Sequence, residues 1–308
     1  MNTPPGTASG RASNALRPLK GIRILSLALN MPGPAALMRC RQMGATCIKL
    51  EPPAPRAAPE GASGDPMRHY NPAAYAAMHQ GVRITAADLK TEAGQKTLHR
   101  ELAKAGVLVT SFRPSAIEKL GLNWKALHQR YPALSQVAIV GSPGARAEKP
   151  GHDLTYLAEN DLVTGLDLPA TLYADMGGSL ITTEAVLQAV LQQRTRGKGV
   201  FIEVALSAAA AWLALPRQWG LTQPQGPVGG AHAGYGVYRC MDGRVALAAL
   251  EPHFAASLCM ACGLGAADFN TMQLPATRQA IAGFLLTQTR AQLDRLAVDR
   301  DIPLHTQK

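Results

Sequence analysis

The stretch IRILSLALNMPGPAALMRCRQMGATCIKLE, residues 22–51, decides the fold. Its first part, Ile22–Leu29, is a short apolar run, which is typical of a strand buried in a parallel sheet. Pro32-Gly33-Pro34 interrupts the run, and Ala35–Met43 then has helical character. Thr46–Leu50 follows as a second apolar strand. Strand, turn, helix and strand together take about 30 residues, the size of a βαβ element.

The same alternation continues along the chain. Three further short apolar segments are predicted strands: Val107–Thr110, Leu134–Val140 and Val200–Leu206. Helices are predicted between and after them: Gly94–Ala105, Ala116–Tyr131 around a break at Gly121, and Ser179–Thr195. Short apolar strands that alternate with amphipathic helices indicate an α/β fold with a doubly wound parallel sheet.

The rest of the chain predicts a different organisation. Residues 1–17 have the composition of a disordered tail, and residues 18–222 form the predicted large domain. A linker rich in glycine and proline covers 223–235. Residues 236–308 combine a hairpin that turns at Asp242-Gly243 with helices at Pro252–Gly263 and Ala276–Asp299, which predicts a small α+β domain.

Charge narrows the class of partner. The 308 residues include 31 Lys and Arg against 21 Asp and Glu, a net charge of +10, which favours an anionic partner. The basic residues are scattered and only 5% of residues are aromatic, so a nucleic-acid partner is not expected. No apolar run approaches the roughly 18 residues of a membrane span, so no membrane partner is expected. A phosphorylated ligand and a merely solvated basic surface both remain open.

The cysteines predict structural thiols. The pair Cys259-Met-Ala-Cys262 is a lone C-x-x-C motif in an apolar, helix-like stretch, so neither a redox pair nor a metal site is expected. No apolar signal segment follows Met1, so we expect a cytoplasmic, reducing compartment.

Three positions carry polar side chains near predicted element ends. His152-Asp153 fits a helix start, with Asp153 favoured by the helix dipole. Asp175 precedes a long helix, where N-capping is its ordinary role. Glu251 stands at a strand-to-helix turn. These residue types alone indicate an α/β enzyme and nothing narrower.

Short motifs in a fixed order resemble the family III CoA-transferases. They are Pro18-Leu19-Lys20-Gly21, Pro32-Gly33-Pro34, Asp88-Leu89-Lys90-Thr91, Phe112-Arg113-Pro114, Lys119-Leu120-Gly121-Leu122 and Arg196-Gly197-Lys198-Gly199. The resemblance implies a Rossmann-like large domain that binds CoA, a smaller domain and an interlocked homodimer. It also implies no cofactor beyond the CoA of an acyl-CoA substrate.

Within that family, the sequence is similar to the racemase branch. There, the residues matching His152 and Asp175 are the two acid/bases, and the residue matching Glu251 is the partner of the histidine. Two acid/bases on opposite faces can invert a stereocentre beside a thioester by 1,1-proton transfer. Their surroundings should then bring the proton affinities of a histidine and a carboxylate together. The amides of Gly177 and Gly178 are the predicted donors to the enolate oxygen.

Other residues and reactions follow from the same resemblance. Arg83, Arg113 and Lys119 are the predicted contacts to the CoA phosphates or adenosine, whereas Lys49 and Lys90 are expected to be structural. The alternative reaction is CoA transfer between carboxylic acids, with Asp175 as nucleophile. A third possibility is a catalytically degenerate CoA-binding protein, because the sequence ends near residue 306, where members of the family continue.

Overall fold

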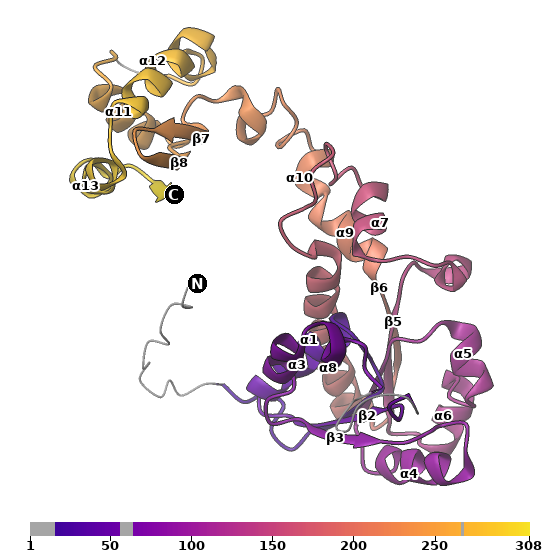
Figure 1. Ribbon diagram of the computed structural model, residues 1–308. Helices are drawn as coiled ribbons and strands as arrows, with labels where there is room; N and C mark the ends of the chain where they lie inside the picture. Colours follow the sequence, from indigo (N-terminus) through magenta and orange to yellow (C-terminus); the bar gives the residue numbers. More distant parts are fainter. Residues whose placement is uncertain (1–15, 56–63, 266–267) are drawn as a thin grey trace. The chain divides into compact units, whose positions relative to one another are not determined.

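The computed structural model describes residues 16–55, 64–265 and 268–308. It divides into two compact units, one ending at Leu213 and one beginning at Ala214 (Figure 1). The predicted boundary after residue 222 lies further along the chain. Most of the predicted tail, residues 1–15, lies outside the described residues.

The first unit contains a six-stranded parallel sheet with the order β3-β2-β1-β4-β5-β6. Its strands are β1 (Arg23–Ser26), β2 (Thr46–Glu51), β3 (Arg83–Ala86), β4 (Val107–Thr110), β5 (Ser135–Val140) and β6 (Phe201–Ala205). This order confirms the predicted doubly wound parallel sheet. The edge strand β3 was not predicted, because Arg83–Ala86 is mostly exposed and lacks an apolar run.

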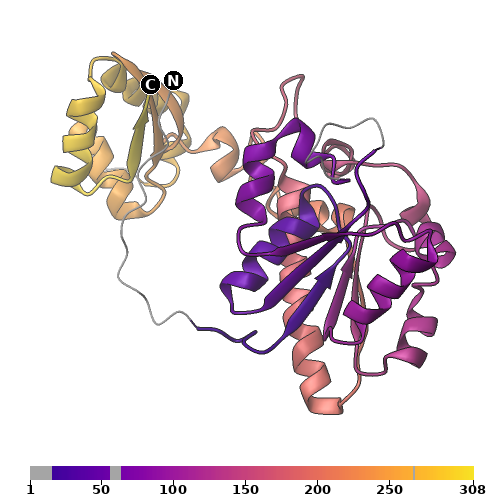
Figure 2. The same ribbon diagram turned by 60° about the horizontal axis from the view of Figure 1, so that its bottom comes forward.

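Helices cover both faces of this sheet (Figure 2). One face is covered by α1 (Pro32–Gln42) and α8 (Tyr173–Arg196), the other by α4 (Glu92–Leu102), α5 (Pro114–Lys119) and α6 (Trp124–Arg130). The first unit also contains α2 (Met67–Tyr70), α3 (Pro72–Met78), α7 (Asp153–Glu159), α9 (Leu206–Leu213) and a 3-10 turn at Gly144–Glu148. Alternate strand residues point to opposite faces. In β4, Val107 packs with α1 and α8, whereas Leu108 packs with α4, α5 and α6. The sheet is therefore buried on both sides, as the apolar runs predict.

Gly121 breaks the predicted helix over residues 116–131 into α5 and α6. Its backbone has a φ of +69°, a conformation that suits glycine and ends a helix. The segment between β2 and α3 contains the short helix α2, and residues 56–63 of that segment lie outside the described residues.

The second unit is a small α+β fold, as predicted. Its antiparallel sheet has the order β7-β8-β9, formed by β7 (Tyr235–Cys240), β8 (Gly243–Ala248) and β9 (Leu304–Gln307). The helices are α10 (Leu215–Gln218), α11 (Pro252–Ala261), α12 (Pro275–Leu286) and α13 (Arg290–Arg300), with helical turns at Pro227–Ala231 and Thr271–Gln273. The single helix predicted over 276–299 is two helices, because Thr289 caps α13 by accepting from the Gln292 amide.

The cysteines are free thiols, as predicted. Burial raises the pKa of Cys262 to about 12 and also raises that of Cys259. Both thiols therefore stay protonated at neutral pH, which does not suit a redox pair. None of the helices in the described ranges is long and apolar enough to cross a membrane.

Gly33 explains the Pro-Gly-Pro turn between β1 and α1. A Cβ atom added at Gly33 would lie 2.2 Å from the Cβ of Ala28 and 3.6 Å from Ile139 Cδ1. Ala28 lies two residues after the end of β1 and is fully buried, so it has no room to move. The glycine therefore lets α1 begin directly against the end of the strand.

We expect Gly33→Ala to lower the free energy of unfolding by about 1–3 kcal/mol, because the new methyl group overpacks a rigid contact. Urea denaturation measures the change. Gly165→Ala is the matched control, since an added Cβ there meets nothing within 4 Å, and its effect should stay within about 0.5 kcal/mol. Equal effects of the two changes would contradict the packing role of Gly33.

Candidate active site

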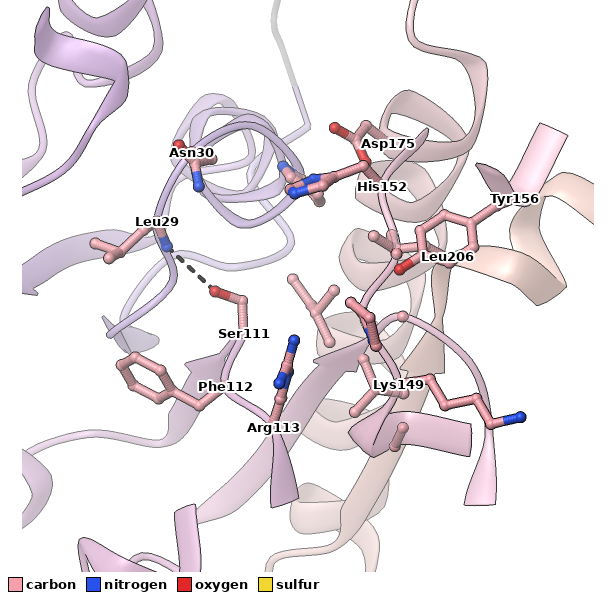
Figure 3. A pocket seen from close by; sticks show the side chains of 17 residues that line it. Leu29, Asn30, Ser111, Phe112, Arg113, Lys149, His152, Tyr156, Asp175 and Leu206 are labelled. Atoms are coloured by element: carbon pink, nitrogen blue, oxygen red, sulfur yellow. Dashed lines mark hydrogen bonds between the residues drawn. The ribbon is translucent and has the colours of Figure 1, made fainter. Parts of the chain in front are cut away.

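A cavity of about 290 Å³ lies at the carboxyl edge of the six-stranded sheet (Figure 3). It sits where the strand order reverses between β1 and β4, the point at which open α/β sheets leave a crevice. Its walls come from the segments after β1, β4 and β5 and from the starts of α7, α8 and α9. Its polar lining residues are Asn30, Ser111, Arg113, Lys149, His152, Tyr156 and Asp175.

His152 is the N-cap residue of α7, which confirms the predicted helix start. Its backbone N–H donates to Thr155 Oγ1 at 3.1 Å, and its carbonyl accepts from the Thr155 amide at 2.9 Å. These bonds fix the backbone at the helix start. The imidazole therefore projects into the cavity from a well-held position, with much of its surface exposed.

Asp175 lies in the first turn of α8 and is half-buried in the wall of the same cavity. Its backbone N–H donates to Asp153 Oδ1 at 2.9 Å, so the buried carboxylate of Asp153 satisfies one open amide at the start of α8. The expectation that Asp175 itself caps the helix is wrong, because Leu172 occupies the N-cap. The Asp175 carboxyl group is thus directed at the cavity rather than at the helix backbone.

The surroundings of Asp175 favour its protonated form. The pKa of Asp175 is raised from 3.8 to about 6. Burial is the largest cause, the negative charge of Asp153 adds to it, and His152 opposes the rise. An ordinary histidine titrates near 6.5. Asp175 has therefore been moved into the range in which a carboxyl group both takes and gives a proton near neutral pH.

Glu251 belongs to the second unit. It stands at the N-cap of α11, after β8, and is exposed, so the predicted strand-to-helix turn is correct. His152 lies in the first unit, and the pairing of Glu251 with it stays a prediction.

Gly177 and Gly178 lie in the second turn of α8, not at its open end, and neither lines the cavity. Amides at this depth in a helix bond to carbonyls four residues back, so they are poor donors to a ligand. A Cβ atom at Gly178 would lie 2.2 Å from Leu206 Cδ2, and one at Gly177 would lie 3.1 Å from Leu213 Cδ1. The structure gives both glycines a packing role between α8 and α9, in place of the predicted oxyanion role.

The predicted CoA contacts fall in two places. Arg113 lines the cavity as the N-cap residue of α5, and Lys119 ends the same helix. Arg83 begins β3 at the amino edge of the sheet, the edge opposite to the cavity, and its guanidinium donates to Glu101 Oε2 at 2.8 Å. The structure therefore brings Arg113 to the site and separates Arg83 from it.

A buried charged cluster supports the loop after β1. Glu51, Asp65 and His79 place possible ligand atoms within 4.8 Å of one another, but the ammonium of Lys49 lies among them. Lys49 Nζ is 3.0 Å from Glu51 Oε1 and 2.9 Å from His79 Nε2, and it pairs with Asp65. The lysine thus supplies the positive charge that these groups need. Asp65 also accepts from the Asn30 amide at 3.2 Å, which ties the cluster to the cavity wall.

Asn30, Ser111 and Tyr156 are lining residues that the sequence analysis did not select. Asn30 and Ser111 follow the carboxyl ends of β1 and β4, and the Leu29 amide donates to Ser111 Oγ at 3.2 Å. A signal was available, since residues just after neighbouring parallel strands meet at one edge of the sheet. Tyr156 lies four residues after His152, so both fall on one side of α7.

The strand order and the position of the cavity define a doubly wound α/β protein with a cavity at the switch point. The sequence belongs to CoA-transferase family III, whose profile matches residues 19–306.

Named relatives include both kinds of enzyme in this family. The chain is 30% identical over 210 residues to "Probable fatty acyl-CoA transferase" of Mycobacterium tuberculosis, which covers 65% of this chain and 53% of that protein. It is 27% identical over 296 residues to alpha-methylacyl-CoA racemase of Mus musculus, covering 89% and 73%. The chain thus spans about half of the first relative's length. A crystal structure of a hypothetical protein from Mycobacterium tuberculosis shares the fold, with a TM-score of 0.79 at 23% identity over 94% of this chain and 85% of that one.

Asp175→Asn should stabilise the protein above about pH 6 and have little effect at pH 4. Because the pKa of Asp175 is higher in the folded state, the carboxyl group has no effect on the free energy of unfolding below pH 3.8, where it is protonated in both states. As pH rises through about 6, the group increasingly destabilises the folded state. The difference should reach about 1–3 kcal/mol, since the site is partly solvated. Urea denaturation from pH 4 to 8 measures it, and the exposed Asp167→Asn serves as control. A flat difference for Asp175→Asn would contradict its shifted pKa.

Asp153→Asn should lower the pKa of Asp175 from about 6 towards the ordinary carboxyl range, because it removes a neighbouring negative charge. The asparagine oxygen can still accept from the Asp175 amide, so the start of α8 is retained. The same pH series, comparing Asp153→Asn with the double variant Asp153→Asn/Asp175→Asn, should show its midpoint at lower pH. An unchanged midpoint would mean that burial alone sets the proton affinity.

Proposed function

We propose that the protein is an acyl-CoA racemase or epimerase that acts by 1,1-proton transfer at the α-carbon of a 2-methyl-branched or similar acyl-CoA. One observation carries the proposal. Asp175, with a pKa of about 6, shares a single cavity with His152, so a carboxyl group tuned towards the histidine range stands beside a histidine. The similarity to the racemase of Mus musculus over 89% of this chain supports the same reaction.

The proposed chemistry is a balanced proton exchange. One of the two groups removes the α-proton, and the electron pair of the C–H bond moves onto the thioester oxygen as an enolate. The other group then protonates the opposite face of the α-carbon while the pair returns to restore the carbonyl. Because each group is an acid in one direction and a base in the other, similar proton affinities keep both directions fast.

Substrate binding follows from the positive charge. Arg113 in the cavity wall and Lys119 at the end of the same helix are suited to the phosphates of CoA, in line with the net charge of +10. Within this proposal, Glu251 would partner His152, the protein would act as a homodimer, and no metal or cofactor beyond the CoA of the substrate would take part.

CoA transfer is the competing reaction. Asp175 would attack the thioester carbonyl and expel CoA thiolate, which leaves a mixed anhydride. The thiolate would then attack the aspartyl carbonyl, releasing the original acyl group as a carboxylate and leaving an aspartyl-CoA thioester. An acceptor carboxylate would attack that thioester to form a second anhydride, from which the thiolate takes the new acyl group and frees Asp175. The relative named as a probable fatty acyl-CoA transferase supports this alternative. It needs Asp175 but assigns no proton to His152, so the two reactions are separable by mutation.

The test follows the α-proton by NMR in deuterated water. Purified protein should replace the α-proton of both enantiomers of a 2-methylacyl-CoA with deuterium and interconvert them, without any added carboxylic acid. His152→Ala and Asp175→Asn should each lose interconversion by at least about 100-fold. Each should still exchange the proton of one enantiomer, and the two variants should prefer opposite enantiomers, because a single base reaches only one face.

Other outcomes contradict the proposal in distinct ways. If no exchange occurs but CoA moves to added carboxylic acids, and His152→Phe keeps that activity, the protein is a CoA-transferase. If both activities are absent while acyl-CoA still binds in calorimetry, the protein is a catalytically degenerate binder.

A further inference from the structure

Tyr156 is a polar group of the cavity that the proposed chemistry has not yet used. It lies in α7, one turn after His152, and the residue is only 4% exposed. Figure 3 shows its hydroxyl turned toward the interior of the cavity, on the side of the cavity that holds His152 and Asp175. Among the residues that the structure describes, the Tyr156 hydroxyl has no hydrogen-bond partner, although it borders the cavity.

Two glycines make room for this hydroxyl. A Cβ atom added at Gly141, just after β5, would lie 2.3 Å from the Tyr156 oxygen. One added at Gly151, just before α7, would lie 2.6 Å from the same oxygen. The tyrosine ring itself packs with Leu157 and Ala174 in a small buried cluster. The hydroxyl is therefore held at a fixed point of the wall. Any residue other than glycine at position 141 or 151 would collide with it.

Burial, with help from neighbouring carboxylates, keeps this hydroxyl protonated. Burial raises the pKa of Tyr156, Asp175 and Glu159 raise it further, and Arg113 opposes them. Desolvation is the largest of these causes, as expected for a buried phenol. At neutral pH the group is thus a neutral O–H donor near the carboxyl group that is proposed to exchange the proton.

We propose that the Tyr156 hydroxyl is a catalytic residue that donates a hydrogen bond to the thioester oxygen of the bound acyl-CoA. This inference rests on the proposed function. When a base removes the α-proton, the electron pair moves onto that oxygen, and the tyrosine O–H, which keeps its own proton, stabilises the enolate. When the opposite acid returns a proton to the α-carbon, the pair moves back and the hydrogen bond weakens.

The same donor fits the competing reaction. Attack by Asp175 on the thioester carbonyl would place the negative charge on the same oxygen. In this proposal, Tyr156 is the oxyanion donor, the role that the sequence resemblance implied for the amides of Gly177 and Gly178. Those two glycines lie inside α8 and pack against α9. A preorganised donor in a buried wall stabilises developing charge more strongly than it stabilises the neutral carbonyl.

Tyr156→Phe is the direct test, because it keeps the ring and removes only the donor. The α-proton exchange rate should fall about 100- to 1,000-fold, with KM for the acyl-CoA changed less than about threefold. Tyr173→Phe, an exposed tyrosine at the start of α8 that does not line the cavity, is the matched control and should keep full activity. A Tyr156→Phe variant with an unaltered thermal midpoint and near wild-type exchange would overturn the inference.

A second measurement does not depend on turnover. Pivaloyl-CoA has no α-proton and cannot racemise, so its thioester carbonyl reports only on binding. The infrared carbonyl stretch of this ligand should shift to lower frequency when it binds to the wild-type protein, and the shift should be lost with Tyr156→Phe. Wild-type protein that shifts the carbonyl but exchanges no α-proton would refute the proposed racemase while supporting the donor. Wild-type protein that exchanges the proton without any carbonyl shift would refute the donor alone.

Discussion

The reversal of strand order between β1 and β4 is the constraint on which the site depends. The chain leaves β1 towards α1 on one face of the sheet and leaves β4 towards α5 on the other, so the two segments diverge and leave a crevice. The hydrogen bond from the Leu29 amide to Ser111 Oγ joins the two segments where they part. The sheet thus provides the floor, and the chemical groups are added from α7 and α8 above it.

Buried charge stabilises the loop that closes one side of this crevice. Lys49 is fully buried and forms ion pairs with Glu51 and Asp65. Asp65 also accepts a hydrogen bond from the Asn30 amide in the cavity wall. His79 donates through Nδ1 to the Tyr75 carbonyl at 2.7 Å, so its Nε2 is left as an acceptor for the lysine. Removing one member would leave an uncompensated charge in the interior, which typically costs several kcal/mol. The cluster therefore fixes the wall of the cavity without contributing chemistry to it.

Sequence reasoning located the sheet because its strands are short apolar runs. The predicted segment Val107–Thr110 coincides with β4. A short, continuous apolar run between polar turns is typical of a strand that is buried on both faces of a parallel sheet. Strands β3 and β9 were missed because both lie at sheet edges and expose half or more of their residues. Local pattern does not report pairing with a distant segment, and pairing alone defines these two strands.

The site was predictable in part, and for a physical reason. His152 and Asp175 stand at helix starts, which are visible in sequence, and the structure brings both to one cavity. Arg83 was predicted to contact CoA, and Gly177 and Gly178 were predicted to contact the enolate oxygen, but none of the three lines the cavity. Sequence order does not tell which edge of a sheet or which turn of a helix a residue occupies. Tyr156 escaped notice because a lone tyrosine in a short helix has no distinguishing pattern until the surrounding backbone is known.

The bond between Asp153 and the Asp175 amide couples shape to acidity. One carboxylate holds the start of α8 against α7 and also sets part of the proton affinity of Asp175. The distance between these two helices is therefore a chemical variable, because Coulomb repulsion between the two carboxylates weakens as they move apart. A wider spacing of the two carboxylates would lower the pKa of Asp175, and a closer spacing would raise it. The acidity of this side chain is therefore tied to the packing of α7 against α8.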